Sequence, residues 1–270
     1  VWARRAQLMS SFAYYAAGEY QEAIGAAQRF LSLHPGSREA PYAYYMVALS
    51  HYNQIMPVNK DQKTTQQALD SLGELIRRYP IKSRNVIAHI RKATQGVVSL
   101  QNCHPFVREL WGRYWVFAHN GDLKDYFPRL HSHFQPVGST DSERAFCWLM
   151  QELAKSHAGT PSVQELTLTL RELVPQVARF GTFNFLLSNG EALWAHCSTK
   201  LHWLVRQHPF APATLMDRDW TVNFAELNHP GDRAAVIVTT PLTHNETWTA
   251  FEPDELKVFV DGLPVLEKSA

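Results

Sequence analysis

Three short polar motifs between positions 88 and 143 carry side chains that could hold an amino acid at both ends. The first motif ends in Arg91, whose guanidinium can clamp a carboxylate with two parallel hydrogen bonds. The second contains Asn120-Gly121, which can offer a side-chain amide and a backbone N–H to a developing oxyanion. The third contains Asp141, whose carboxylate can accept hydrogen bonds from an α-ammonium group. Together the motifs supply a cation, an oxyanion hole and an anion.

Each motif also has a purely structural interpretation. Arg91 could pair with a nearby acidic residue at the end of a strand. An Asn-Gly pair readily forms a tight turn with positive φ. Asp141 or Ser139 could be the N-cap of a helix, with Glu143 in its first turn complementing the helix dipole. The order and character of the motifs together, more than any one of them, favour a functional site.

Composition narrows the classes of function. The chain has 270 residues, 45% of them hydrophobic, which suffices for one or two ordinary domains. The formal net charge is +1 and the basic residues are scattered, which argues against binding to nucleic acid or to an anionic membrane surface. There is no run of about 18 apolar residues, as a membrane span requires. No apolar core follows Arg4-Arg5, so no signal peptide and a cytoplasmic location are expected.

Cysteine and histidine patterns do not indicate a metal site. Cys103, Cys147 and Cys197 lack metal-ligand spacing, and their odd number gives no disulfide framework, which favours a reducing compartment. The 13 histidines include no HExxH pair. We therefore expect neither a metal nor a cofactor.

The elements that must position these motifs begin only after an all-helical segment, residues 1–80. Apolar residues recur at helical spacing up to Ala16, where Gly18-Glu19 breaks the first helix. The sequence predicts three more helices, over residues 20–33, 41–56 and 64–79. Small residues such as Ala23 and Ala27 allow close packing, and a proline follows each unit, which is typical of helical-hairpin repeats. An ordinary helical bundle is the alternative.

From residue 81 to residue 270 the pattern is mixed. Ser162 and Glu165 fit a capping box, and Asp261-Gly262 fits a hairpin turn. The sequence predicts helices over residues 141–156 and 162–180, and strands over residues 86–90, 114–118, 183–187, 192–197, 201–206, 234–239, 248–251 and 256–260. We expect these strands to form stacked sheets flanked by helices.

Residues 81–265 resemble class II glutamine amidotransferases of the N-terminal-nucleophile type, in particular the small YafJ-like branch. The stretches that carry the resemblance are residues 86–91, 93–94, 96, 102–106, 108–112, 118–121, 138–143, 145–148, 197–199, 201–203 and 245–248. The resemblance implies an α+β fold, a four-layer αββα sandwich, that holds glutamine or a γ-glutamyl amide.

The same resemblance assigns roles to the candidate residues. It implies that Arg91 binds the α-carboxylate of glutamine and Asp141 the α-ammonium group. It implies that Asn120 and Gly121 form the oxyanion hole, and that His104 supports the substrate side of the site.

The sequence departs from this family at the nucleophile. The family cleaves the side-chain amide through a thioester on an N-terminal Cys, whose α-amino group is the general base. Residue 1 here is Val, and none of the three cysteines can replace that Cys by position. We therefore expect a truncated sandwich that lacks its nucleophile segment and has no glutaminase activity.

Residues 1–80 resemble the tetratricopeptide region of BamD-type outer-membrane assembly lipoproteins, which bind partner proteins in the periplasm. The stretches that carry this resemblance are residues 2–9, 13–15, 18–20, 22–24, 29–30, 33–35, 41–45 and 75–80. Because the two segments meet abruptly near Tyr79-Pro80-Ile81 without a flexible linker, we interpret the chain as a chimera of two proteins. Three functions remain open: an amidotransferase-type enzyme domain, a helical-repeat scaffold for a protein partner, and a non-catalytic binder of glutamine or a γ-glutamyl compound.

Overall fold

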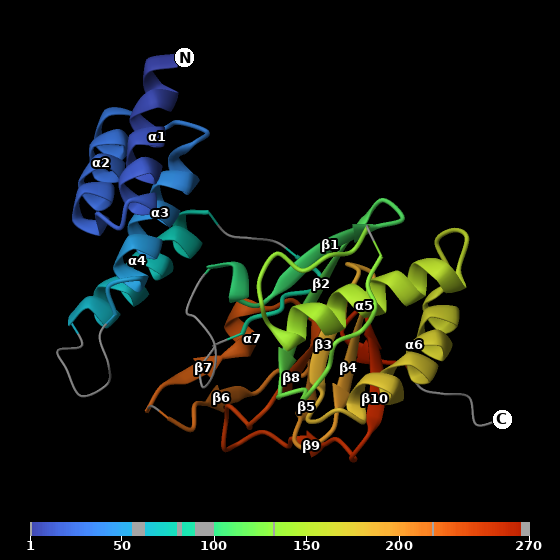
Figure 1. Cartoon of the computed structure of the whole chain (residues 1–270). Coiled ribbons are helices and arrows are strands. Elements are labelled where there is room, and N and C mark those ends of the chain that lie inside the picture. The colour runs from blue at the N-terminus through green and yellow to red at the C-terminus, as the bar shows by residue number, and fades with distance from the viewer. Residues whose placement is uncertain are drawn as a thin grey trace. The chain divides into compact units, whose positions relative to one another are not determined.

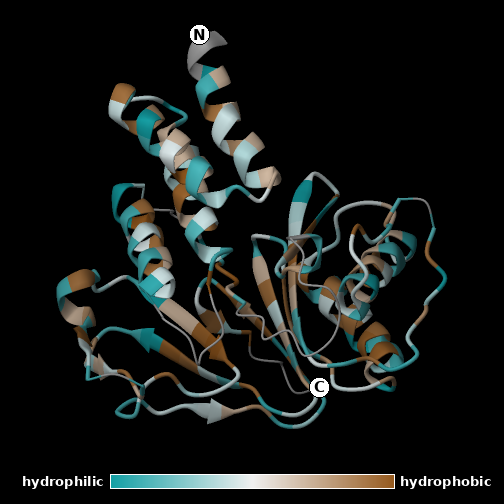
Figure 2. Cartoon of the chain, turned by 60° about the vertical axis from the view of Figure 1, so that its left-hand side comes forward, coloured by the Kyte–Doolittle hydropathy of each residue, from teal (hydrophilic) through white to brown (hydrophobic). Residues whose placement is uncertain are grey.

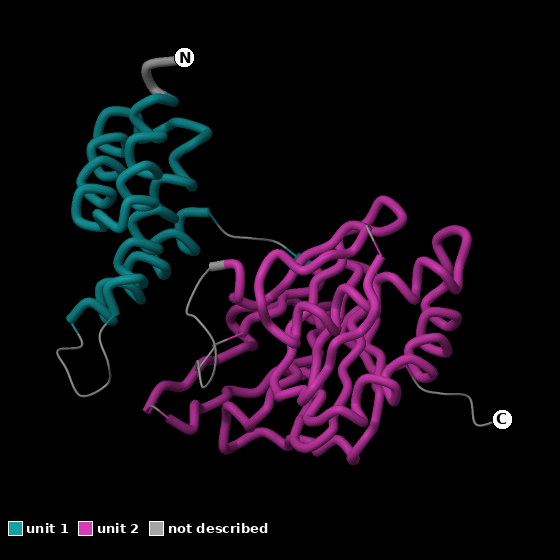
Figure 3. Tube along the Cα trace, in the orientation of Figure 1, with its two compact units in different colours: residues 1–83 teal, residues 84–270 magenta. Residues whose placement is uncertain are grey.

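The computed structural model describes residues 2–55, 63–79, 83–89, 100–131, 133–217 and 219–265. The chain divides into two compact units, residues 1–83 (unit 1) and residues 84–270 (unit 2), coloured teal and magenta in Figure 3. Within the described part of the chain, none of the helices has the length and apolar character needed to cross a membrane.

The described part of unit 1 consists of helices that pack on one another in sequence order (Figure 1). They are α1 (Trp2–Ala16), α2 (Tyr20–Leu33), α3 (Ala40–Tyr52) and α4 (Lys63–Arg78). Leu8, Phe30 and Met46 form the centre of the core that joins α1, α2 and α3. Fully buried alanines, Ala23 and Ala27, let α2 approach its neighbours closely, as the sequence predicts.

The third helix is shorter than predicted, because it ends at Tyr52 instead of residue 56. The side-chain amide of Asn53 donates a hydrogen bond to the Leu49 carbonyl at 2.9 Å and another to the Tyr15 hydroxyl at 3.0 Å. This amide satisfies one of the open carbonyls at the helix end and ties that end to α1. The other three helices form where the sequence predicts them, to within about a residue.

Unit 2 is built on an antiparallel six-stranded sheet with the order β1-β2-β3-β4-β10-β11. Its strands are β1 (Phe106–Leu110), β2 (Arg113–Asn120), β3 (Asn184–Ser188), β4 (Ala192–Cys197), β10 (Glu255–Val260) and β11 (Leu263–Pro264). Two helices, α5 (Asp141–Ser156) and α6 (Val163–Ala178), connect β2 to β3 and cover one face of this sheet (Figure 1).

The core between the helices and the six-stranded sheet is rich in aromatic rings. Trp115 of β2 stacks on Trp194 of β4 with ring centroids 5.8 Å apart, and Phe117 of β2 stacks on Phe146 of α5 at 5.0 Å. All four side chains are buried. This packing fixes the end of β2 beside the start of α5, the two elements that carry Asn120 and Asp141.

A second sheet, in the order β8-β5-β9, packs on the other face of the first. Its strands are β5 (His202–Gln207), β8 (Arg233–Val238) and β9 (Thr249–Ala250). The remaining described elements are a two-stranded ribbon and two short helices: β6 (Pro212–Thr214), β7 (Thr221–Asn223), η1 (Leu100–Asn102) and α7 (Phe224–Leu227). Leu193 and Cys197 of β4 meet Trp203 and Ile237 between the sheets. Figure 2 shows hydrophobic, brown segments on several strands as well as on the helices.

The predicted combination of helices and sheets in unit 2 is confirmed, and among the described residues the layers follow the order helix, sheet, sheet. The helix over residues 141–156, the capping box of Ser162 and the hairpin at Asp261-Gly262 all form as predicted. Seven of the predicted strands form with ends shifted by at most about two residues.

The predicted strand over residues 86–90 is wrong for residues 86–89, which the structure describes. Residues 86–89 pair with no strand in the described part of the chain, although Ile87 packs against the core between the two sheets. In this run Ile87 is partly buried while Val86 is 73% exposed, so its apolar composition leads neither to a described strand nor to full burial. Strand β1, in contrast, was not predicted. It pairs with β2 through a hairpin turn at Trp111-Gly112, where Trp111 has a φ of 57°. Tryptophan rarely adopts a positive φ, so the sequence does not indicate a turn at this position.

Candidate functional site

The end of β2 and the start of α5 are held together by two hydrogen bonds, one on each side of Asn120-Gly121. The carboxylate of Asp141 accepts a hydrogen bond from the backbone N–H of Leu123 at 2.8 Å. The imidazole Nδ1 of His119 lies 2.8 Å from the hydroxyl of Ser142. The structure thus brings together two of the sequence-predicted motifs, those of Asn120-Gly121 and Asp141.

Both predicted oxyanion donors are available to a ligand. Asn120 and Gly121 are exposed, and neither the Asn120 side-chain amide nor the Gly121 N–H forms a hydrogen bond with any described residue. The Asn120 carbonyl, in contrast, is engaged, because it accepts a hydrogen bond from the side-chain amide of Asn184 at 3.1 Å. The backbone at the end of β2 is therefore anchored while its donors remain open.

Position 121 requires a glycine because there is no room for a side chain, and not because its φ is unusual. A Cβ atom at this position would overlap the backbone carbonyl oxygen of Thr182 and would lie 2.7 Å from Nε2 of His119. The chain can pass this point only without a side chain.

His119 is held in one tautomer. Its Nε2 lies 2.9 Å from the Thr182 carbonyl oxygen, which can only accept, so Nε2 carries the proton and Nδ1 accepts from the Ser142 hydroxyl. The imidazole is buried, and this burial lowers its pKa below the ordinary value. The lowered pKa favours the neutral imidazole, in which Nδ1 accepts from the Ser142 hydroxyl.

The N-cap of α5 is Thr140, which corrects the structural interpretation that assigned the cap to Asp141 or Ser139. The Thr140 hydroxyl accepts a hydrogen bond from the N–H of Glu143 at 3.2 Å. Because Thr140 satisfies this end of the helix, the Asp141 carboxylate is free to turn toward Leu123.

A further segment, residues 102–105, lies against the loop of residues 137–140 that leads into α5. Asn102 is buried, and its side-chain oxygen accepts a hydrogen bond from the N–H of Ser139 at 2.9 Å. Gly138 allows this approach, because a Cβ atom there would overlap the Asn102 side chain. The half-buried His104 packs between His89 and Phe106, with ring centroids 4.4 and 4.5 Å away. Sequence reasoning names His104 but not Asn102, although buried asparagines in loops commonly bond to backbone groups.

Arg91, the predicted carboxylate clamp, lies outside the described residues. His89, two positions earlier, is described, and its ring packs on His104. That contact places the described end of the first motif beside the loop of residues 102–105.

Glu143 has a role that differs from the predicted one. It is 1% exposed and points into the unit, where it accepts a hydrogen bond from Arg108 at 2.5 Å. It also accepts from the backbone N–H groups of Val137 and Gly138 at 3.0 and 2.7 Å. Glu143 therefore shapes the loop that leads into Asp141, instead of only complementing the helix dipole. Arg108, its partner, was missed as a site-supporting residue.

Each of the three cysteines lies inside the chain, so none has the free α-amino group that the family's nucleophile uses. Cys147 and Cys197 are buried in α5 and β4, and burial raises the pKa of each thiol. Cys103 is half-buried and has an ordinary peptide nitrogen, because it lies inside the chain. Within the described part of the chain, no three His, Cys, Asp or Glu side chains are grouped to hold a metal ion.

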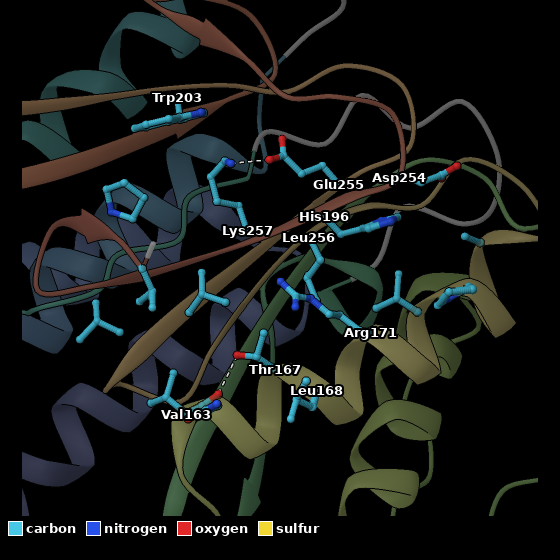
Figure 4. A pocket seen from close by; sticks show the side chains of 18 of the residues that line it. Val163, Thr167, Leu168, Arg171, His196, Trp203, Asp254, Glu255, Leu256 and Lys257 are labelled. Carbon is cyan, nitrogen blue, oxygen red and sulfur yellow. Dashed lines mark hydrogen bonds and ion pairs between the residues drawn. The ribbon is translucent and has the colours of Figure 1, made fainter. Parts of the chain in front are cut away.

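An open cavity of about 1670 Å³ lies elsewhere, between α6 and β10 (Figure 4). Its walls include Thr167 and Arg171 of α6 and His196 of β4, with Trp203 and the Lys257–Glu255 ion pair at one end. Of the predicted site residues that the structure describes, none lines this cavity, so it is separate from Asn120-Gly121.

Comparison with known proteins assigns both segments. The family of class II glutamine amidotransferases matches residues 42–270, and the tetratricopeptide repeat family matches residues 5–37. The chain is 45% identical over 202 residues to a candidate glutamine amidotransferase of Escherichia coli, YafJ, covering 74% of this chain and 79% of that protein.

Two further similarities agree with this division. The crystal structure of a predicted glutamine amidotransferase from Pseudomonas aeruginosa superposes with a TM-score of 0.59 and 40% identity, covering 66% of this chain and 70% of that one. The outer membrane protein assembly factor BamD of Caulobacter vibrioides is 48% identical over 79 residues, which are 29% of this chain and 26% of that protein.

The family match extends over most of the chain and includes all the motifs that converge around Asn120-Gly121 and Asp141. The chain belongs to the class II glutamine amidotransferases.

Proposed function

We propose that unit 2 binds glutamine or a γ-glutamyl amide at the junction of β2 and α5. The observation that carries this proposal is the pair of open donors at Asn120 and Gly121, held by hydrogen bonds beside the carboxylate of Asp141. The γ-carbonyl oxygen of the ligand would accept from both donors, and its α-ammonium group would donate to Asp141. In this proposal Arg91 binds the α-carboxylate and His104 supports the loop around the site.

The hydrogen bonding of Asp141 fits this role. One carboxylate oxygen accepts from Leu123, while the other lies 3.4 Å from the Ser142 hydroxyl. A carboxylate offers about four lone-pair positions, so acceptor capacity remains for an ammonium group. The bond to Leu123 meanwhile fixes the direction in which the carboxylate points.

Binding of glutamine tests this proposal. In the Asp141→Asn variant we expect the affinity for L-glutamine to fall about tenfold to a hundredfold, because a charge-assisted hydrogen bond is lost while the amide oxygen can still accept from Leu123. In Asn120→Ala the fall should be about fivefold. Isothermal titration with L-glutamine measures both, with D-glutamine as the stereochemical control.

Asp232→Asn is the matched control, because Asp232 also accepts a backbone N–H, that of His229, at 2.8 Å in a turn. Its affinity for L-glutamine should equal that of the wild type. An unchanged affinity in Asp141→Asn would overturn the proposed site.

We further propose that a protein consisting of residues 1–270 binds glutamine without hydrolysing it. A class II site needs a thiolate with a free α-amino base beside it, and Cys103, Cys147 and Cys197 are all internal residues. A coupled assay of ammonia release should therefore give the rate of the buffer alone. Ammonia release that Asn120→Ala or Asp141→Ala abolishes would contradict this expectation.

A second candidate function belongs to unit 1, which we propose to be a scaffold for a protein partner. Helical repeats bind partners along the surface formed by successive helices. Tyr42, Tyr45 and Tyr52 of α3 recur on one helical face, and each is more than a third exposed. A photo-reactive residue at Tyr45 should cross-link a partner in cells, whereas one at the exposed Arg38 serves as the control position. Cross-linking of an outer-membrane assembly component would favour for unit 1 a role like that of the assembly factor BamD.

A further inference from the structure

We infer that His119 and Ser142 act as a positioning pair, which sets the oxyanion donors at the correct place relative to Asp141. This inference rests on the proposed function of the site. Neither side chain offers a group to the ligand, because both are buried, His119 at 2% and Ser142 at 5% exposure. Their effect on a ligand must therefore pass through the residues that they hold.

The pair links three segments through one imidazole. Ser142 in the first turn of α5 donates to Nδ1, and Nε2 donates to the carbonyl of Thr182, which lies just before β3. The ring therefore bridges α5 and the entry to β3 while belonging to β2 itself. Each of its nitrogens has one partner of fixed direction, so the ring has a single orientation.

The packing around the imidazole makes this orientation rigid. Its ring lies 5.2 Å from the ring of Phe183 and 6.5 Å from that of Phe117, measured between centroids. Gly121 lies next to Nε2, so close that a Cβ atom at Gly121 would stand 2.7 Å from this nitrogen. A rotation of the imidazole would thus displace Gly121 and the N–H that it offers.

Asp141, in contrast, has supports of its own. Its carboxylate is bonded to the Leu123 N–H, and the helix start is capped by the hydrogen bond between Thr140 and Glu143. Removing the Ser142 hydroxyl leaves these two bonds in place, and the contact that Asp141 loses with it is a long one of 3.4 Å to the other carboxylate oxygen. The loss should therefore reach the donors of Asn120-Gly121 and spare the acceptor for the α-ammonium group.

This difference gives a test that a merely structural role would not satisfy. L-glutamine uses both halves of the site, whereas L-norvaline has the same chain length and α-groups but no γ-carbonyl. In Ser142→Ala we expect the affinity for L-glutamine to fall about fivefold, while that for L-norvaline changes by less than about twofold. Ser142→Thr, which keeps the hydroxyl, should restore the ratio of the two affinities.

A matched control exists at the far end of α5, where His157 Nε2 lies 2.8 Å from the Thr169 hydroxyl. Thr169→Val removes a hydroxyl from the same kind of pair and should leave both affinities unchanged. Should Ser142→Ala not fold, His119→Asn serves instead, because its amide oxygen replaces Nδ1 but the bond to Thr182 is lost. It should lower the same ratio.

The outcomes separate the two proposals. If the wild-type protein binds no glutamine, the proposed function fails and this inference fails with it. If the wild type binds glutamine but the folded variant keeps the wild-type ratio of glutamine to norvaline affinity, or loses both affinities equally, the inference alone fails. A selective loss of glutamine affinity supports the positioning pair.

Discussion

In a Glu143→Ala variant, we expect the free energy of unfolding of unit 2 to fall by about 3 kcal/mol. The change leaves the guanidinium of Arg108 without its ion-pair partner in a site where that side chain is only 19% exposed. It also removes the acceptor for the backbone N–H groups of Val137 and Gly138. An uncompensated buried cation and two unsatisfied donors together make this the largest single loss that we expect in the chain.

Chemical denaturation followed by tryptophan fluorescence measures this loss. The signal reports on unit 2, because Trp2 is the one tryptophan of the eight that lies in unit 1. Glu191→Ala is the control, since its ion pair with Arg113 is half exposed and should contribute less than about 1 kcal/mol. Equal losses in the two variants would show that burial of the Arg108–Glu143 pair has no energetic consequence.

A double variant, Arg108→Met with Glu143→Leu, separates the two causes. An apolar pair of similar volume removes the buried charge, so the part of the loss that comes from the unpaired guanidinium should be recovered. The part that comes from Val137 and Gly138 should remain, because neither new side chain can accept their hydrogen bonds. The remainder measures how strongly Glu143 holds the loop before Asp141.

The position of Asp141 at a helix start could be predicted from the sequence, but its role in the local structure could not. Ser139, Thr140 and Asp141 are three consecutive residues that can all cap a helix. Local rules do not choose among them. The choice is made by two contacts with residues far away in the sequence. Asn102 accepts a hydrogen bond from the N–H of Ser139, and the Asp141 carboxylate accepts one from Leu123. Thr140 is therefore the residue that caps the helix.

The apolar run that ends at Asn120 illustrates the opposite case. Its strand was predictable because alternate side chains enter a core of aromatic rings, and the run forms β2. The similar run over residues 86–89 does not form a strand in the described structure, although Ile87 is partly buried. Both runs have the composition of strands, so among the described residues the difference lies in whether another strand pairs with the run. Pairing is a property of the whole sheet, which a local pattern cannot contain.

The convergence of the motifs was suggested by a resemblance rather than by spacing. The sequence around His119 does not indicate that its ring bonds to both Ser142 and Thr182. These three residues are far apart along the chain, so no local pattern contains all of them. A histidine near the end of an apolar strand is weak evidence for a functional role. Most buried histidines of this kind are core residues whose hydrogen bonds are satisfied. The contact becomes visible only when β2, α5 and β3 are assembled.

The second large effect is expected at Gly121. In Gly121→Ala the new methyl group would overlap the backbone carbonyl of Thr182, and a backbone atom cannot rotate away as a flexible side chain can. The segment after β2 must shift, so we expect the free energy of unfolding to fall by about 1–3 kcal/mol. The same shift moves the N–H of Gly121 and the amide of Asn120 away from the ligand carbonyl, so the affinity for L-glutamine should fall at least about tenfold.

The control for this variant is Gly159→Ala, because a Cβ atom at Gly159 meets no atom within contact distance. Its stability and its affinity for L-glutamine should both match the wild type. Denaturation and titration of the same two variants also distinguish the causes of any loss. A Gly121→Ala protein that is destabilised but binds L-glutamine normally would mean that the γ-carbonyl does not contact Asn120-Gly121. If it instead loses affinity for L-glutamine and keeps its affinity for L-norvaline, the close approach at Thr182 is what places the donors on the γ-carbonyl.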